Sequence, residues 1–128
     1  MLRKLLGVIL LALIAMAVSR VPAQAADALP IKGAYGDVEG KGCDSYKEET
    51  EGPYFVIDED GRGYGSGGEC GCKVTSVKKT GEDAYSFVAV CQCIDSPNKE
   101  TETSKLFILS DTEIELDGTK YRKCEPLP

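Results

Sequence analysis

The sequence predicts an all-β fold, a small antiparallel meander of about eight strands that forms a barrel or a compact sandwich. Three observations support this prediction. After residue 32, short runs rich in Val, Ile, Thr, Tyr and Phe alternate with Gly, Asp and Ser. No apolar period of 3.6 residues follows residue 25. Six cysteines, an even number, are typical of a small disulfide-linked domain.

Residues 1–25 form a predicted export signal, with a signal helix over its apolar part. Arg3 and Lys4 precede an uncharged stretch over residues 5–18, and Ala23-Gln24-Ala25 fits the small-x-small cleavage pattern. The stretch is shorter than the roughly 20 apolar residues that span a bilayer. We therefore expect cleavage after Ala25, no stable membrane anchor, and a periplasmic or extracellular protein of the bacterial envelope.

Cleavage changes the charge of the chain. It removes three basic residues and no acidic one, which leaves 12 basic and 21 acidic side chains and a net charge of −9. Such a surface argues against nucleic acid and anionic membranes as partners and is compatible with a basic protein. The absence of His excludes a Ser-His-Asp or Cys-His catalytic pair and a His-ligated metal.

Within the mature chain, residues 26–32 are a predicted lead-in and residues 33–128 a single disulfide-linked β domain. Asp60-Gly61 and Asp117-Gly118 predict type I′ hairpin turns, and Gly81 predicts a type II′ turn. Residues 47–51 have room for one helical turn at most. The expected strands cover residues 33–37, 53–58, 62–65, 73–79, 84–90, 105–109, 113–116 and 119–123.

Four cysteines define a register for the long hairpin. If the chain turns at Gly81, Cys70 faces Cys93 and Cys72 faces Cys91. All four sulfurs then lie on one face, because side chains alternate along a strand. Directly opposed Cα atoms lie about 4.5–5.5 Å apart, within the disulfide range. We therefore expect two cross-strand disulfides, Cys70–Cys93 and Cys72–Cys91.

The remaining pair, Cys43–Cys124, would join the two ends of the domain and close a loop of about 80 residues, worth up to ~4 kcal/mol in the chain-entropy model. The face that carries the hairpin sulfurs continues with Val74, Ser76 and Lys78 on the first strand. We expect this face to turn toward the core, with Lys78 at the solvent rim.

Other uses of the cysteines remain open. The alternatives are a metal site with four cysteine ligands, a thiol-disulfide redox pair, and a staggered set of disulfides, Cys43–Cys70, Cys72–Cys91 and Cys93–Cys124. Export and the C-x-C spacing argue against the metal site. The redox role lacks a C-x-x-C motif at a helix start, and no cation adjoins Cys70, Cys91 or Cys93 in sequence.

One segment partly fits a calcium-binding loop. Asp58, Asp60, Ser66 and Glu69 fall at positions one, three, nine and twelve of the EF-hand pattern. Arg62 stands at position five, where an oxygen ligand is needed, and no helix is predicted on either side. Calcium is the one cofactor that the sequence suggests, and the alternative is a hairpin turn followed by a glycine-rich stretch.

Two surface features are candidate interaction sites. The glycine-rich segment carries Tyr64 and Ser66, which form a candidate binding loop. Glu113, Glu115 and Asp117 alternate with apolar residues and predict an acidic stripe on one strand. The stripe is either a solvated face or a docking site for a basic partner.

The layout of an export signal, about 100 mature residues, about eight strands and several cysteines resembles that of the periplasmic inhibitors of c-type lysozyme. That resemblance implies an eight-stranded antiparallel barrel with disulfides. Family members carry a Ser-Gly-Ala-x-Tyr type segment that enters the lysozyme active site. The most similar segment here, residues 64–69, lacks the Ala and the Tyr that follow Ser-Gly in that motif. No functional residue is therefore carried over.

The sequence thus favours an exported, non-enzymatic binding module, an inhibitor or partner of a basic protein. Two alternatives come from other classes. One is a thiol-disulfide redox protein that uses the C-x-C pairs. The other is a structural or stress-related envelope protein without a discrete site.

Overall fold

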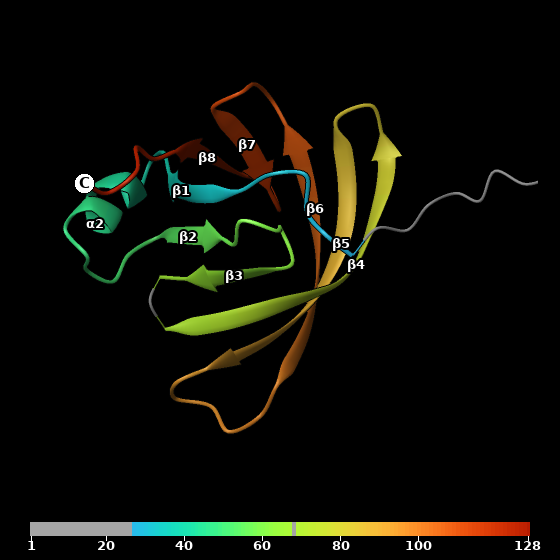
Figure 1. The fold of residues 1–128 in the computed structure, drawn as a ribbon, viewed down its shortest axis with the longest axis horizontal. Helices are drawn as coiled ribbons and strands as arrows, with labels where there is room; N and C mark the ends of the chain where they lie inside the picture. The colour runs from blue at the N-terminus through green and yellow to red at the C-terminus, as the bar shows by residue number, and fades with distance from the viewer. Residues whose placement is uncertain (1–26, 68) are drawn as a thin grey trace, which may run out of the picture.

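The computed structural model describes residues 27–67 and 69–128, and the predicted export signal lies outside them. The described residues form eight β-strands and one short helix (Figure 1). In chain order these are β1 Gly33–Asp37, α2 Gly42–Lys47, β2 Tyr54–Ile57, β3 Gly63–Ser66, β4 Cys70–Gly81, β5 Ala84–Cys93, β6 Glu100–Ile108, β7 Glu113–Leu116 and β8 Thr119–Lys123.

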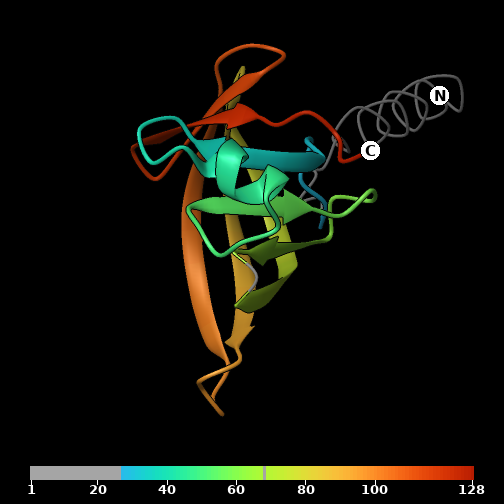
Figure 2. The same ribbon diagram turned by 90° about the vertical axis from the view of Figure 1, so that its left-hand side faces the viewer.

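The strands close into an antiparallel barrel in which each strand pairs with the next one along the chain. Closure comes from β1, which pairs with both β2 and β8. The predicted all-β meander is confirmed, and the barrel is the form it takes. Strands β4, β5 and β6 are the longest, and Figure 2 shows them extending well past the shorter strands at one end.

The core lies inside the barrel, with Leu106 and Ile114 as its most deeply buried large side chains. Leu29 belongs to this core as well, although it lies in the segment predicted as a lead-in. Its side chain is 7% exposed, and its N–H donates to the Gly61 carbonyl at 2.8 Å. The chain before β1 is therefore packed against one end of the barrel. The other core residues are Tyr35, Phe55, Ile57, Val74, Val77, Phe87, Ala89 and Cys91.

Two of the predicted turns have different outcomes. Asp117 and Gly118 both have positive φ, 49° and 86°, as a type I′ turn requires. Between β2 and β3 only Gly61 has positive φ, and its N–H donates to the Asp58 carbonyl at 2.9 Å. The type I′ prediction at Asp60-Gly61 is therefore wrong, since a longer connection joins these strands.

The β4–β5 hairpin keeps the predicted register near its cysteines and loses it toward the turn. Pairing is as predicted from Cys70 to Val74, and a β-bulge at Thr75 then shifts it by one residue. A second irregularity pairs Gly81 with Ala84. The two residues between them make the turn, so the predicted type II′ turn with Gly81 and Glu82 at its centre is wrong.

The bulge changes which side chains of β4 face the core. Val74 and Val77 are both 3% exposed, whereas Ser76 and Lys78 are exposed. The prediction that Ser76 lies on the inner face is therefore wrong, whereas the exposure of Lys78 agrees with its predicted place at the solvent rim. The extra residue brings two valines, three positions apart, onto the same inner face.

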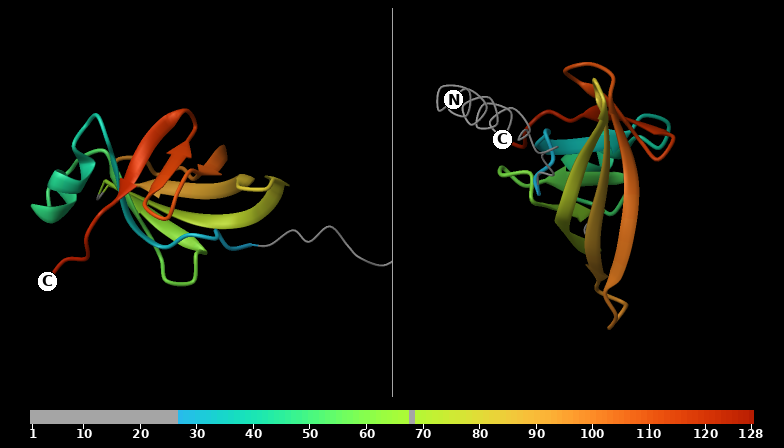
Figure 3. Two further views of the ribbon diagram at one scale, coloured as in Figure 1. Left: turned by 90° about the horizontal axis from the view of Figure 1, so that it is seen from above. Right: turned by 90° about the vertical axis from the view of Figure 1, so that its right-hand side faces the viewer.

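Helix α2 begins earlier than the helical turn expected over residues 47–51 and ends at Lys47. At six residues it is too short to produce a helical period. The disulfide between Cys43 and Cys124 holds it at the closing edge of the barrel. Figure 3 shows α2 and the β4–β5 turn on opposite sides of the molecule. No helix formed by the described residues is long and apolar enough to cross a membrane.

Candidate binding site

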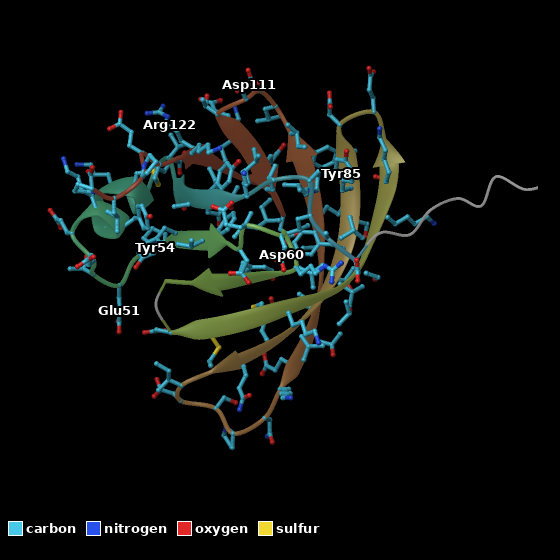
Figure 4. The ribbon with its side chains drawn as sticks, in the orientation of Figure 1. Glu51, Tyr54, Asp60, Tyr85, Asp111 and Arg122 are labelled. Carbon is cyan, nitrogen blue, oxygen red and sulfur yellow. A yellow bond between two sulfur atoms is a disulfide. The ribbon has the colours of Figure 1, made fainter. Side chains whose placement is uncertain are left out.

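The structure contains the two disulfides that the hairpin register predicts and the bridge between the remaining pair of cysteines, and all six sulfurs take part in them. Cross-links of this kind are compatible with an oxidising compartment. The staggered pairing is wrong, and a four-cysteine metal site is excluded because no thiolate remains to bind an ion. The bonded pairs are Cys43–Cys124, Cys70–Cys93 and Cys72–Cys91. Figure 4 shows a disulfide between β4 and β5.

A pocket of about 140 Å³ opens on the inner face of the hairpin disulfides. It exists because β6 pairs with β7 only from Leu106 to Ile108. The first half of β6 therefore pairs with β5 on one side and with no other described strand. We call this cavity the disulfide pocket. It is lined by the four hairpin cysteines together with Tyr64, Ser66, Ser96, Asn98, Glu100 and Glu102.

Four of these pocket residues were not among the residues predicted from sequence: Ser96, Asn98, and the two charged ones, Glu100 and Glu102. Glu100 pairs with the inward-facing Cys91, and Glu102 with the fully buried Ala89, so both positions lie on the inner face of β6. Both remain exposed because the barrel is open there. The signal was the alternation Glu-Thr-Glu-Thr over residues 100–103, a strand pattern with charges in place of apolar residues.

Tyr64 and Ser66, predicted as a binding loop, belong to strand β3 and face the pocket from there. The Tyr64 hydroxyl lies 3.9 Å from Cys91 Sγ, and Glu102 Oε2 lies 3.7 Å from the same sulfur. Because Cys91 is in a disulfide, the hydroxyl is the only donor among these groups. Burial, followed by the charges of Glu102 and Asp117, raises the pKa of Tyr64 to about 12.

Three further carboxylates gather beside the pocket. A hydrogen bond with Glu51 and then the charge of Glu51 raise the pKa of Glu69, and Asp95 adds a smaller contribution of the same sign. All three side chains are exposed. We call Glu51, Glu69 and Asp95 the acidic rim. They come from the segment after α2, the β3–β4 turn and the β5–β6 connection, so only the fold brings them together.

The predicted calcium loop is not assembled. Asp58 and Asp60 lie in the β2–β3 connection, whereas Ser66 and Glu69 flank the β3–β4 turn at the opposite end of β3. Asp60 Oδ1 instead accepts a hydrogen bond from the Arg62 N–H at 3.1 Å. Figure 4 shows Asp60 far from Glu51, which is the neighbour of Glu69 in the acidic rim. Residues 27–67 and 69–128 contain no group of three His, Cys, Asp or Glu side chains suited to a metal ion.

The predicted acidic stripe has basic side chains beside it. Glu113 pairs with Arg122 across β7 and β8, and Glu115 pairs with Lys120. Asp117 lies in the following turn, where its Oδ1 accepts a hydrogen bond from the Lys105 N–H at 2.9 Å. Opposite charges face each other across the two strands, so the stripe contributes little net negative potential.

A larger hollow of about 520 Å³ lies beside the Leu29 segment. Its charged groups are partly paired, since Lys32 Nζ lies 3.5 Å from Glu59 Oε2. Nearby, Arg62 lies 3.9 Å from Asp27. These are the ion pairs within 4 Å among the described residues, and neither involves the disulfide pocket or the acidic rim.

The pocket and its rim therefore present carboxylates, hydroxyls and an amide around an apolar floor of disulfides. Such a surface can accept hydrogen bonds and hold a cationic side chain. The chain matches no protein-family model, and no curated protein or solved structure is similar enough to it to provide a relative.

Proposed function

We propose that this chain is an exported protein-binding module that binds a basic partner at the disulfide pocket and its acidic rim. The observation that carries the proposal is the pair of inward-facing carboxylates, Glu100 and Glu102, in an open pocket. Charged side chains on the inside of a small barrel disfavour packing. Their presence beside a preformed cavity is better explained by binding than by stability.

Charge supports a basic partner. Five carboxylates surround this part of the molecule, and none of them lies within 4 Å of a cation among the residues described. Such a concentration of charge attracts a basic protein and accelerates encounter at low ionic strength. The resemblance to periplasmic lysozyme inhibitors makes c-type lysozyme, which is basic, the first partner to test.

The surroundings of the sulfurs favour a structural role over redox chemistry. A carboxylate oxygen of Glu102 lies 3.7 Å from Cys91 Sγ in the Cys72–Cys91 bridge. A negative charge disfavours a thiolate and so raises the pKa of a neighbouring thiol. Thiol-disulfide exchange needs the opposite environment.

Direct binding tests the proposal. The mature protein is immobilised and exposed to c-type lysozyme and cytochrome c, two basic proteins of different fold, with serum albumin as an acidic control. We expect binding to at least one basic protein at low salt, weakening as salt rises. Glu100→Gln combined with Glu102→Gln should weaken it about tenfold.

The matched control is Glu113→Gln combined with Glu115→Gln, which removes the same charge from the predicted acidic stripe. We expect this variant to bind almost as tightly as the wild type, because Arg122 and Lys120 already oppose those carboxylates. Equal weakening in both variants would overturn the assignment of the site. Absence of binding to both basic proteins would overturn the proposed function.

A further inference from the structure

Ile94 is the most exposed large apolar side chain among the described residues, at 80% exposure. The next is Leu109, at 46%. Ile94 stands at the start of the β5–β6 connection, the loop at the bottom of Figure 1. Fully burying such a side chain is worth about 1.5–3 kcal/mol, so its exposure in the free protein is unfavourable.

The loop that carries Ile94 is held in place. The Cys70–Cys93 disulfide lies directly before it, and the Ile94 N–H donates to the Glu69 carbonyl at 2.9 Å. The Ser96 N–H donates to the Cys93 carbonyl at 3.2 Å. A side chain presented on a fixed backbone loses little conformational entropy when it binds.

The Cys70–Cys93 bridge is hard to explain by global stability alone. The Cys72–Cys91 bridge lies two residues nearer to the hairpin turn on each strand. Once one bridge has closed the hairpin, the second constrains only a short additional segment of the unfolded chain, so its entropic contribution is small. Its position at the base of the β5–β6 connection is where a brace for Ile94 is needed.

The surface beside Ile94 is hollowed and acidic. A shallow depression next to it is lined by Gly71, Gln92 and Pro97, and a Cβ atom at Gly71 would meet nothing within 4 Å. Asp95 follows Ile94 directly in the chain, and Glu69 supplies the carbonyl that accepts the hydrogen bond from the Ile94 N–H. An apolar tip thus stands within the acidic rim.

We propose that Ile94 is the anchor by which this module docks, and that it enters an apolar pocket rimmed by Lys or Arg side chains on the basic partner. This inference rests on the proposed function and adds the apolar half of the contact. Well-packed apolar anchors contribute most to protein–protein affinity. Pairing of two copies through the same face would bring two acidic rims together, which disfavours a second copy as the occupant.

The test compares three variants with the wild type for binding to c-type lysozyme and cytochrome c. Ile94→Ser removes the anchor, and Gly71→Gln fills the adjacent depression. Leu109→Ser is the matched control, because it removes the next most exposed large apolar side chain, directly after the opposite end of β6 (the top of Figure 1). All three positions are exposed, so thermal melting should show folded proteins.

We expect Ile94→Ser to raise Kd at least tenfold and to leave the salt dependence of binding unchanged, because the lost contact is apolar. Gly71→Gln should also weaken binding, and Leu109→Ser should not. Wild-type affinity in Ile94→Ser would overturn this inference and leave the proposed function standing. Failure of the wild type to bind either protein would overturn both. A dimer that Ile94→Ser abolishes in sedimentation equilibrium would instead assign the loop to a second copy and overturn the proposal.

Discussion

Gly36 and Gly42 lack side chains where β1 and α2 touch through their backbones. A Cβ atom at Gly36 would overlap the backbone at Gly42 and Cys43, and one at Gly42 would overlap the Pro53 carbonyl and the backbone at Gly36. Neither glycine has positive φ, so close approach rather than backbone conformation requires them. They let the helix lie near enough for the Cys43–Cys124 bridge to form.

We predict that Gly36→Ala lowers the free energy of unfolding by at least about 2 kcal/mol, because backbone atoms must move to admit the methyl group. Gly71→Ala is the matched control, since its Cβ atom would meet nothing within 4 Å. That change should stay within about 0.5 kcal/mol of the wild type. Urea denaturation measures both, and equal values for the two variants would contradict the close packing of α2 on β1.

Because of the Tyr64 hydroxyl, the free energy of unfolding depends on pH in the alkaline range. Its pKa is raised from 10.0 to about 12, by burial first and then by Glu102 and Asp117. The unfolded chain therefore loses this proton at lower pH than the folded protein. The stability that the protonated hydroxyl contributes is present below pH 10 and is lost as pH rises toward 12.

We predict that Glu102→Gln lowers the pKa of Tyr64, because it removes a nearby negative charge. Ultraviolet titration of tyrosinate measures the change, and subtraction of the same titration in Tyr64→Phe assigns it to this residue. Tyr35 and Tyr121, whose pKa values are also raised by burial, should titrate unchanged. An unaltered Tyr64 titration in Glu102→Gln would place that carboxylate away from the hydroxyl.

At the residue scale, the cysteines were predictable and the pocket carboxylates were not. The predicted pairing of Cys70 and Cys72 is confirmed, although the turn lies one residue further along the chain than predicted. The β-bulge at Thr75 and the second irregularity near the turn offset that difference at the cysteine end. Glu100 and Glu102 look like surface charges in the sequence. Their inward position follows from pairing with Cys91 and Ala89, and they stay exposed there because β7 is shorter than β6.

At the element scale, the β-bulge in β4 decides which residues form the core. Alternation from Cys72 puts Ser76 on the inner face, whereas the structure puts Val77 there against Phe87. Compared with an unbroken alternation, the bulge buries Val77 in addition to Val74. An extra residue of this kind leaves no mark in local alternation, so the exchange of faces could not be predicted.

We predict that Val77→Ala destabilises the protein by about 1–3 kcal/mol, because it removes two buried methyl groups. Ser76→Ala, on the neighbouring exposed position, should change the free energy of unfolding by less than about 0.5 kcal/mol. Thermal or urea denaturation of the two variants distinguishes the bulged register from an unbroken one. A larger loss of free energy of unfolding in Ser76→Ala than in Val77→Ala would contradict the bulge and support an unbroken alternation.

Most strands were predictable because each is a run of β-branched and aromatic residues that ends at turn residues. The expected and observed bounds of β1, β7 and β8 are the same. Helix α2 was missed, because six residues cannot show a helical period and its position depends on tertiary contacts. The start of β6 was missed because Glu and Thr replace the usual apolar residues there.

At the scale of the whole molecule, closure was the feature that sequence left undecided between a barrel and a sandwich. Closure depends on pairing between β1 and β8, which lie at opposite ends of the chain. No local pattern reports such a contact. The Cys43–Cys124 bridge ties helix α2, just after β1, to the residue that follows β8, and so crosses the same closing edge.

The charge of the molecule is unevenly arranged. No carboxylate of the pocket, the rim or the stripe lies within 4 Å of a cation among residues 27–67 and 69–128. The difference lies in the register: Glu113 and Glu115 on β7 are paired with Arg122 and Lys120, whereas Glu100 and Glu102 are paired with uncharged residues. Sequence composition gives the net charge and not this arrangement. The proposed contact with a basic partner rests on this arrangement, because an uneven distribution of charge steers encounter.

Mapping the contact of the basic partner on the isotope-labelled protein by nuclear magnetic resonance tests the account most directly. During titration with the basic protein that binds, the largest amide shifts should fall on residues 94–102 and on Tyr64 and Ser66. Raising the salt concentration should reverse them. Shifts concentrated on residues 113–122 would instead identify the stripe as the docking surface and contradict binding at the disulfide pocket.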